Sequence, residues 1–489
     1  MAIKTAAQYL ESLAKLDLDL YVLGEKVTNR LEHALVRPSI NSVAMTYKLA
    51  QKPATKELAT TDSMLTGEVV NRFNSLFQSR DDLVKKIKLQ RELGRRTGCC
   101  FQRCVGMDAI NAVFSTTYEM DQKHQTDYHL RFKEYVKFIQ SNDLVVNGAM
   151  TDVKGDRSRP PGKQSDLDMF VHIVDRNKQG LVIRGAKASQ TGAANSHEIL
   201  IMPTQRLREG DEDYAVCCAF PSDSKGVTMI YGRQPSDTRK LEKGDMDIGN
   251  YGFGGHETLT VLENVFVPWE RVFMGGEVDF SSMLVERFAS YHRQSYGGCK
   301  TGVAEVLIGA AAAMADYNGV PEVSHLRDKI AEMVHLCETL YCGGLACSYE
   351  GEKTLAGNYQ PNILLANVCK LNVTRLPYEI CRLAEDVAGG LLVTMPSQAD
   401  LEHPVVGRLV KKYLRGTEAA PAETRMRMLS LIQCLTMGVA APSFRTESMH
   451  GAGSPMAQKI MIMRQTDLED KKKLARKLAG IEEREDPLG

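Results

Sequence analysis

The sequence predicts an α+β fold in which a helical N-terminal domain and a C-terminal helical bundle flank a strand-rich middle. Three observations predict this class. Apolar residues recur at helical spacing up to about residue 142, short strand-like runs bounded by turn residues occupy 143–278, and the helical period returns from 279 onward. We therefore predict a helical domain over 1–142, an antiparallel β-barrel over 143–278 and a helical bundle over 279–489.

Length, charge and cysteine content narrow the function classes. Among 489 residues, Lys plus Arg and Asp plus Glu balance at 61 each, so no net field favours nucleic acid or an anionic membrane. The first residues, MAIKTAAQYLESLAKLDLDLY, lack the apolar core of a secretory signal, and charges interrupt each apolar run before it could cross a bilayer. We expect a cytoplasmic chain whose 12 cysteines are packing residues or metal ligands rather than disulfides.

Four helical segments are predicted in the N-terminal domain. Thr5 and Gln8 have the form of a capping box that starts the first, and a charged amphipathic helix follows over 79–96. The run CFQRCVGMDAINAVFSTTYEM (100–120) predicts a helix with Cys100 and Cys104 on its buried face, because residues four apart share a face. A fourth helix over 126–141 closes the domain.

The middle domain is predicted from five strand-like runs: GLVIRGAKA (180–188), HEILIMPTQ (197–205), DYAVCCAFPSD (213–223), GVTMIYGRQ (226–234) and ETLTVLENVFVPWERVF (257–273). Two segments between and before them, 148–162 and 187–198, are rich in small polar residues. Their backbone amides suit a flavin or a phosphate, and the alternative is two ordinary surface loops.

The C-terminal bundle is predicted from long amphipathic segments over 303–317, 325–349 and 366–390, the last ended by Gly389 and Gly390. Near the end of the chain, RTESMHGAGSP (445–455) carries Glu447 in a glycine-rich setting. We expect an irregular loop there, which is either part of a site or a solvated connector.

The stretch ERFASYHRQSYGGCK (286–300) brings a metal ligand, acid–base groups and a cation together, namely His292, Tyr296, Cys299 and Lys300. On a helix, the step from His292 to Cys299 leaves the two side chains within roughly 20° of one face but about 10 Å apart along the axis. Glycine is poor in a helix interior and takes positive φ freely. We therefore expect the helix to end at Gly297 and Gly298 and to fold Cys299 back toward His292.

Three thiols and one imidazole would form a metal site if Cys100 and Cys104 met His292 and Cys299. Soft sulfur ligands select zinc or iron–sulfur clusters, and an imidazole in place of a thiolate changes the charge and potential of a cluster. The alternative is that the two paired cysteines are small buried hydrophobic residues, as free cysteines commonly are.

The motifs CFQRCVGMDAINAVFSTTYE, HRQSYGGCK and RTESMHGAGSP resemble those of the 4-hydroxybutyryl-CoA dehydratases, and the likeness extends from the first helix nearly to the last. The wider family includes flavin-dependent 4-hydroxyphenylacetate 3-monooxygenases, which share the fold and as a group lack the cysteine set. The resemblance implies an acyl-CoA-dehydrogenase-like architecture and a homotetramer with FAD at the subunit interfaces.

The resemblance also implies the site residues. The 4Fe-4S ligands fall on Cys100, Cys104, His292 and Cys299. The catalytic groups fall on His292, Tyr296, Glu257, Glu447 and Lys300. The substrate-binding groups fall on Arg91, Gln102, Thr191 and Lys300. The FAD contacts fall on Met150, Thr151, Asp152, Asp156, Arg157, Gln190, Thr191 and Gly390.

Three positions in this sequence bear on the assignment of site residues from the resemblance. Cys99 adjoins Cys100, so the ligand register can slip by one, and the shared helix face favours Cys100. Ser189 stands where the resemblance leads us to expect histidine, and His256 where it leads us to expect glutamine. Both substitutions bear on flavin or acyl-chain contacts.

The implied reaction removes water from a CoA thioester, 4-hydroxybutyryl-CoA, to give crotonyl-CoA by a flavin-radical mechanism with the cluster as Lewis acid. Vinylacetyl-CoA isomerase activity is expected alongside, because moving a double bond needs some of the same proton transfers. Two other functions stay open. One is a flavin-dependent aromatic monooxygenase of the same fold, and the other is a tetrameric scaffold with a purely structural cluster.

Overall fold

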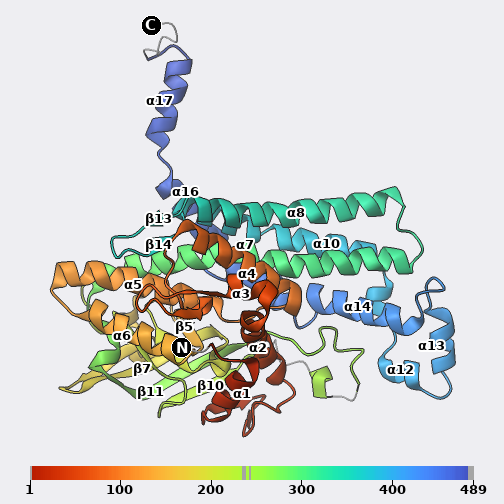
Figure 1. The fold of residues 1–489 in the computed structure, drawn as a ribbon, viewed down its shortest axis with the longest axis horizontal. Coiled ribbons are helices and arrows are strands. Elements are labelled where there is room, and N and C mark those ends of the chain that lie inside the picture. The colour runs from red at the N-terminus through yellow and green to blue at the C-terminus, as the bar shows by residue number, and fades with distance from the viewer. Residues whose placement is uncertain (1–2, 234–237, 242–243, 483–489) are drawn as a thin grey trace.

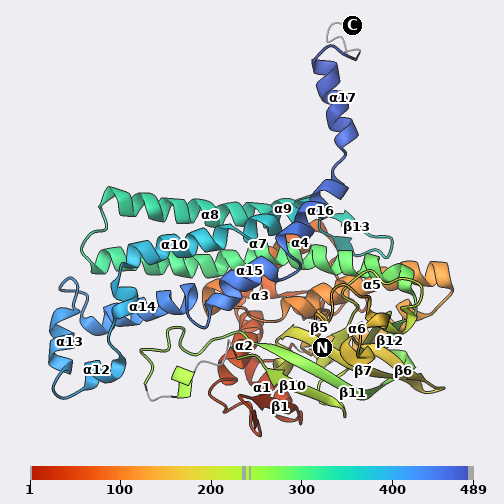
Figure 2. The same ribbon diagram turned by 180° about the vertical axis from the view of Figure 1, so that it is seen from behind.

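The computed structural model describes residues 3–233, 238–241 and 244–482. Long helices run side by side along one side of the molecule, and the strands lie below them (Figures 1 and 2). The N-terminal helices are α1 (Ala6–Ala14), α2 (Arg37–Gln51), α3 (Pro53–Ala59), α4 (Arg80–Thr97), α5 (Cys104–His124) and α6 (Tyr128–Ser141). The later helices are α7 (Val278–Tyr317), α8 (Ser324–Tyr349), α9 (Ile363–Val373), α10 (Leu376–Ala388), α11 (Leu391–Thr394), α12 (Gln398–Glu402), α13 (Gly407–Tyr413), α14 (Ala422–Thr436), α15 (Glu447–His450), α16 (Pro455–Gln465) and α17 (Leu468–Leu478).

Local capping explains where the first helices begin and end. The predicted capping box forms, because the Thr5 side chain accepts from the Gln8 amide and the Gln8 side chain reaches back to the Thr5 backbone. The side chain of Ser79 caps α4 by accepting from the backbone N–H of Asp82. α4 ends at Gly98, whose φ of 58° lies in the left-handed region that glycine adopts without strain.

α5 begins at Cys104, so the prediction that Cys100 and Cys104 share one helix face is wrong. The connection from α4 to α5 is not helical, and both Gly98 and Gln102 have left-handed φ values, of 58° and 64°. A residue in this region ends a right-handed helix. Cys100 therefore approaches the start of α5 from a tight turn.

The strands form two main sheets. The larger has the order β2–β1–β10–β11–β7–β6 and the smaller β12–β9–β8–β5. Their bounds are β1 (Asp19–Val22), β2 (Glu25–Lys26), β5 (Val146–Ala149), β6 (His172–Arg176), β7 (Gly180–Thr191), β8 (Glu198–Ile201), β9 (Val216–Pro221), β10 (Val227–Tyr231), β11 (Glu257–Pro268) and β12 (Val272–Gly275). Two hairpin-like pairs are separate, β3 (Thr60–Asp62) with β4 (Val69–Asn71) and β13 (Glu352–Lys353) with β14 (Tyr359–Gln360).

The mixed α+β class is confirmed, whereas the closed barrel is not. Within the residues that the structure describes, no ladder closes the two main sheets into one barrel. Two pairings are parallel, β1 with β10 and β5 with β8. All five predicted strand-like runs contain strands, although the last divides into β11 and β12 and the run over 226–234 ends on a residue outside the described ones.

α7 is a single helix of 40 residues, so the predicted helix end at Gly297 and Gly298 is wrong. These glycines serve packing instead. A Cβ on Gly298 would lie 2.6 Å from the Ile87 carbonyl oxygen in α4, and a Cβ on Gly297 would lie 2.6 Å from the Gly344 Cα in α8. Close packing of three helices thus outweighs the poor helix propensity of glycine.

The C-terminal region also departs from expectation in two places. The segment 366–390 forms two helices, α9 and α10, which separate just before Pro377. The segment 445–455 is not an irregular loop throughout, because a π-helical turn over Pro442–Thr446 continues directly into α15. Gly389 ends α10 with a φ of 76°, as predicted.

Two hydrophobic cores meet along α7. One extends from the N-terminal helices through both main sheets to Cys299, and the other begins at Val303 and lies among α7, α8, α10 and α14. By length and composition, α7 is apolar enough to cross a membrane. However, 67% of its most apolar stretch is buried against the rest of the chain, so this stretch serves packing. The domain boundaries at 142 and 278 stay a prediction.

Candidate active site

α7 places His292, Tyr296 and Lys300 one turn apart on one face, with Cys299 beside them. The His292 and Tyr296 rings meet edge to face with centroids 5.1 Å apart. Glu447 of α15 faces this row: the Tyr296 hydroxyl donates to one carboxylate oxygen at 3.3 Å, and Lys300 Nζ donates to the other at 2.9 Å. The structure therefore brings four of the five predicted catalytic residues into contact.

Burial and charge fix the protonation states of two of these groups. Burial, and then the Glu447 carboxylate, raise the pKa of Tyr296 well above its usual value. Burial opposes the ammonium form of Lys300, but the attraction of Glu447 outweighs it and raises the pKa of Lys300. Near neutral pH the site thus holds a neutral phenol and a cationic lysine.

The three predicted thiol ligands gather beside Tyr296. Hydrogen bonding to Cys100, and then burial, raise the pKa of the Cys104 thiol well above its usual value, and Cys299 adds to this effect. Burial raises the pKa of Cys299 to about 12, and Cys100 contributes to that shift as well. Each thiol is therefore close enough to the others to oppose their ionisation.

The neighbouring thiol of Cys99 is engaged elsewhere. Its Sγ lies 3.2 Å from the Ser42 hydroxyl oxygen, and burial raises the pKa of Cys99 to about 12. These contacts support Cys100 as the thiol that belongs to the group. Among the described residues, no three His, Cys, Asp or Glu side chains are placed to hold a single metal ion. A cluster of several irons spreads its ligands more widely, because each ligand binds a different iron.

Sequence reasoning missed a buried ion pair behind His292. Asp108 of α5 accepts from His292 Nδ1 at 2.8 Å and from Lys86 Nζ of α4 at 2.7 Å, and both Asp108 and Lys86 side chains are 0% exposed. Burial opposes ionisation of Asp108, but Lys86 and His292 outweigh it and lower its pKa. The one signal available was spacing, because Asp108 follows Cys104 by four residues on a helix.

Glu257 supplies a second carboxyl group in a different environment. It begins β11, and both its oxygens accept from Thr191 Oγ1 of β7, at 2.7 and 2.8 Å. Burial, and then the negative charge of Glu447, raise the pKa of Glu257 well above its usual value. This shift favours the protonated form of Glu257, whereas Glu447 is ion-paired with Lys300.

Two further residues that no motif identified enclose Tyr296. Lys370 of α9 is 0% exposed, donates to the Ser448 carbonyl oxygen at 2.6 Å and places Nζ 4.9 Å from the Tyr296 ring centroid. Burial, and then the positive charge of Lys300, lower the pKa of Lys370 to about 7. Gly451 faces the hydroxyl, because a Cβ at this position would lie 2.1 Å from Tyr296 Oη.

Most residues predicted to contact FAD gather where β5 ends against β7. The Thr151 carbonyl oxygen accepts from the Ala188 amide at 2.9 Å and from Gln190 Nε2 at 3.1 Å. Lys187 Nζ donates to the Met150 carbonyl oxygen at 2.9 Å. The predicted FAD contacts at 150–152 and those at 190–191 therefore form one structural unit.

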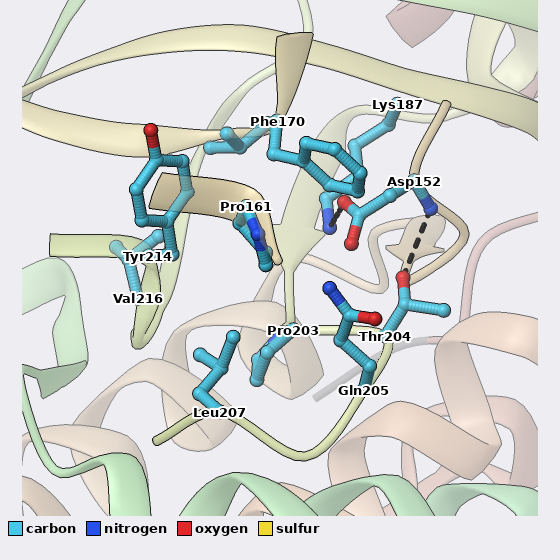
Figure 3. Close-up of a pocket in the computed structure, with 11 residues that line it drawn as sticks. Asp152, Pro161, Phe170, Lys187, Pro203, Thr204, Gln205, Leu207, Tyr214 and Val216 are labelled. Atoms are coloured by element: carbon cyan, nitrogen blue, oxygen red, sulfur yellow. Dashed lines mark hydrogen bonds and ion pairs between the residues drawn. The ribbon is translucent and has the colours of Figure 1, made fainter. Parts of the chain in front are cut away.

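A small pocket adjoins this unit (Figure 3). Asp152 and Lys187 form an ion pair of 2.5 Å in its wall, and the Asp152 amide donates to Thr204 Oγ1 at 2.9 Å. Phe170 and Tyr214 supply apolar walls, and Figure 3 shows the Phe170 ring beside this polar group. The pocket has a volume of about 10 Å³, enough for about one water molecule.

Two buried polar atoms beside Thr191 have no hydrogen-bond partner within the described part of the chain, namely Asn147 Oδ1 and His256 Nε2. Asn147 Nδ2 donates to the Thr191 carbonyl oxygen at 2.8 Å, and the His256 carbonyl oxygen accepts from the Gly192 amide at 3.2 Å. Both side chains are 1% exposed. Buried polar atoms are normally paired, so a bound polar ligand is the natural partner for these two.

Five predicted residues are not brought to the Tyr296–Glu447 group. Arg91 is ion-paired with glutamates of α7 and α8, and the Gln102 amide donates to backbone oxygens of the N-terminal region and of the segment before β11. Asp156 and Arg157 are exposed on the connection after β5, and Gly390 is exposed at the start of α11.

Fold and site together define a class. The family model for the N-terminal part of 4-hydroxyphenylacetate 3-hydroxylase matches residues 5–274, and the model for its C-terminal part matches residues 281–480. A solved oxygenase component of 4-hydroxyphenylacetate 3-monooxygenase shares the fold, with a TM-score of 0.84, 23% identity and coverage of 97% of this chain and 98% of that one. A glutaryl-coenzyme A dehydrogenase shares the overall fold more distantly, at a TM-score of 0.51 and 13% identity over 95% of this chain and 96% of that one.

Two relatives are much more similar. The 4-hydroxybutyryl-CoA dehydratase/vinylacetyl-CoA-Δ-isomerase of Clostridium aminobutyricum is 58% identical over 486 residues, which are 98% of this chain and 99% of that protein. The structure of an oxygen-tolerant archaeal 4-hydroxybutyryl-CoA dehydratase from N. maritimus has a TM-score of 0.96 and 55% identity, over 99% of this chain and 97% of that one. The chain therefore belongs to the 4-hydroxyphenylacetate 3-hydroxylase family and, within it, to the 4-hydroxybutyryl-CoA dehydratase/vinylacetyl-CoA isomerases.

Proposed function

We propose that this enzyme dehydrates 4-hydroxybutyryl-CoA to crotonyl-CoA and also isomerises vinylacetyl-CoA, using FAD and a 4Fe-4S cluster. One observation carries the proposal: thiols from the α4–α5 turn, α5 and α7 gather beside a tyrosine and an imidazole. The identity to the dehydratase of Clostridium aminobutyricum over nearly its full length supports it.

The donor set fits an iron–sulfur cluster held by Cys100, Cys104, Cys299 and His292. Buried thiols that raise one another's pKa do not ionise together unaided, and coordination to iron supplies the positive charge that stabilises thiolates. Asp108 occupies His292 Nδ1 and leaves Nε2 for a metal. When bound, the cluster would supply a Lewis acid for the leaving hydroxyl group.

The surroundings of Thr191 fit FAD. The orphaned Asn147 Oδ1 and His256 Nε2 offer an acceptor and a ring nitrogen to a polar ring system, and Met150, Thr151 and Asp152 shape the adjoining turn. The distant oxygenase that shares the fold is described as complexed with FAD. When bound, the flavin would supply the one-electron chemistry that makes the unactivated C3 hydrogen acidic.

The protein groups divide the proton transfers. Glu257, whose raised pKa favours the protonated form, is the proton donor, and the Glu447 carboxylate, oriented by Lys300 and Tyr296, is the acceptor for the C2 proton. His292 would be the base for the C3 proton once its Nε2 is displaced from the iron, because Asp108 occupies Nδ1. Lys300 also stabilises negative charge that develops on the thioester.

The remaining predicted contacts point to an assembly. Gly390, Asp156 and Arg157 are exposed and do not reach the Thr191 region of their own chain. In a homotetramer with FAD between subunits, such residues complete the cofactor site of another copy. Arg91 and Gln102 stay predicted substrate contacts that require the thioester to reach them.

The test is product formation by anaerobically purified protein loaded with FAD. We expect 4-hydroxybutyryl-CoA and vinylacetyl-CoA both to yield crotonyl-CoA, and His292→Cys to lose dehydration. Oxygen-dependent hydroxylation of a phenol by an iron-free protein would instead identify an aromatic monooxygenase. Full dehydration by a His292→Cys variant that retains its cluster would remove the imidazole from the mechanism.

A further inference from the structure

The buried ion pair behind His292 has no role in the proton transfers above. Lys86 Nζ uses its three hydrogens on Asp108 Oδ1 at 2.7 Å, the Tyr291 carbonyl oxygen at 2.8 Å and Gln294 Oε1 at 3.0 Å. Asp108 Oδ2 accepts from His292 Nδ1 at 2.8 Å and from the Ser295 hydroxyl at 3.0 Å. Every hydrogen-bonding position of the cation is therefore filled, and the carboxylate is oriented from three sides.

Stability does not require this arrangement. Taking a lysine and a carboxylate out of water costs about as much as their attraction returns, and apolar residues of similar size commonly serve as well. Both groups are 0% exposed, so the full desolvation cost applies. The Lys86–Asp108 pair contacts the His292 imidazole through Asp108. We therefore look for its role in the orientation of that imidazole.

An ionised carboxylate can only accept hydrogen bonds. Its neighbour His292 Nδ1 must therefore carry the hydrogen, and in a neutral imidazole this leaves Nε2 with its lone pair. Because Asp108 Oδ1 accepts from Lys86 Nζ and Oδ2 faces His292 Nδ1, the hydrogen-bond geometry orients His292 before any metal arrives. Metal-binding histidines are commonly oriented in this way by a carboxylate.

We propose that Asp108 is a positioning residue that holds His292 with Nε2 free for iron, and that Lys86 holds Asp108 in place. The inference rests on the proposed cluster. Asp108 and the ligand Cys104 are four residues apart on α5, so one helix carries both a direct ligand and the group that orients another.

The test compares iron retention in three variants. Asp108→Asn replaces an obligate acceptor by an amide that can also donate, and Lys86→Met/Asp108→Asn removes both charges, so that no buried ammonium is left without a counter-ion. Asp82→Asn is the matched control, because Asp82 also forms a buried ion pair with a cation, Arg72, at 2.7 Å but touches none of the proposed ligands. Iron release to a chelator is followed by absorbance, and imidazole binding by pulsed EPR of ¹⁵N-histidine protein.

We expect both Asp108 variants to release iron roughly 10- to 100-fold faster than the unmodified protein and to lose the ¹⁵N coupling, and Asp82→Asn to stay within about twofold. Release rates and ¹⁵N coupling unchanged in both Asp108 variants would overturn the inference while leaving the proposed function intact. Unmodified protein that binds no iron would overturn the proposed function, and this inference with it.

Discussion

At the scale of single residues, the buried Tyr296 side chain is surrounded by charged and close-packed neighbours. Glu447 accepts from its hydroxyl, and Lys300 and Lys370 lie 5.1 and 4.9 Å from its ring centroid. Cations near an aromatic face stabilise it and fix its orientation. The position of this hydroxyl is therefore determined by the protein, and small changes around it should alter activity before stability.

Gly451→Ala tests this enclosure. The new methyl group would lie 2.1 Å from Tyr296 Oη, so the contact between Tyr296 and Glu447 must be displaced. We expect kcat for crotonyl-CoA formation to fall by roughly 10- to 100-fold, since displacements of about 1 Å have such effects. Gly309→Ala is the control: nothing lies within 4 Å of the added Cβ, the site is in α7, and helix propensity favours alanine by about 0.5 to 1 kcal/mol. Equal activities of the two variants would contradict the enclosure.

Lys370 makes the free energy of unfolding depend on pH. Its pKa is lowered to about 7 by burial and by Lys300, so above this pH the folded protein holds Lys370 neutral while the unfolded chain keeps the proton. Stability must then rise with pH from about 7 to 10, and the unmodified protein should gain roughly 1.4 kcal/mol per pH unit relative to Lys370→Met. Denaturant unfolding at several pH values measures this. The exposed Lys48→Met variant should run parallel to the unmodified protein, and a parallel Lys370→Met curve would refute the assignment.

Motifs identified the residues that share one helix, but not those that meet it from elsewhere. His292, Tyr296 and Lys300 are visible in the sequence as a repeat of four. Asp108 and Lys370 come from other helices. The spacing of Asp108 from Cys104 is the one sequence signal for it, and nothing in the local sequence distinguishes Lys370 from an ordinary surface charge. Only packing shows that they are buried and face α7.

At the scale of elements, the approach of α4 to α7 depends on glycine. A Cβ on Gly302 would lie 2.1 Å from the Arg91 carbonyl oxygen, and a Cβ on Gly94 would lie 2.8 Å from the Cys299 carbonyl oxygen. Backbone thus packs on backbone beside a proposed cluster ligand. The same contact places Lys86 of α4 within reach of the residues around His292.

Gly302→Ala should separate the two helices. Because backbone atoms cannot yield as a flexible side chain does, we expect a loss of about 1 to 3 kcal/mol in the free energy of unfolding, together with reduced iron content. Chemical denaturation and iron analysis measure the two effects. Gly309→Ala again serves as the control, and a Gly302→Ala variant as stable as that control would show that α4 and α7 are not in this contact.

The sequence predicted the helices well and their interruptions poorly. Periodicity located α4, α6 and α8, because each presents one apolar face to a core. Gly297 and Gly298 were misinterpreted as a helix end, because local propensity does not reveal a neighbouring backbone. Cys100 was misplaced because Gln102 adopts a left-handed conformation that no local pattern indicates, and its side chain bonds to the distant residues Gly254 and Asn195.

At the scale of the whole molecule, α17 extends away from the body (Figures 1 and 2) and has no buried residue. Leu468 and Leu474 are 41% and 55% exposed. A single helix of 11 residues is marginal in water by itself. An amphipathic helix in this position is suited to pack on another copy of the chain, in agreement with the proposed homotetramer.

Truncation after Thr466 tests the role of α17 in assembly. We expect the full chain to sediment as a tetramer, and the truncated chain to dissociate at concentrations roughly tenfold higher or more, because apolar contact area is lost. Analytical ultracentrifugation over a dilution series provides the comparison. Identical dissociation of both chains would show that α17 makes no such contact.

The arrangement of sheets was the least predictable feature. Alternating patterns located the strands, but their pairing joins residues far apart in sequence, such as Leu20 with Met229 and Gly148 with Leu200. The barrel was predicted from strand spacing alone, and the structure has two main sheets instead. The site was more predictable than the sheets because its motifs are local and chemically distinctive.

Iron and sulfide content of anaerobically purified protein tests the central claim most directly, with Cys104→Ala and Cys99→Ala measured in parallel. The account predicts about four irons and four sulfides per chain in the unmodified protein and in Cys99→Ala, and their loss in Cys104→Ala. An iron-free unmodified protein, or full iron content in Cys104→Ala, would contradict it.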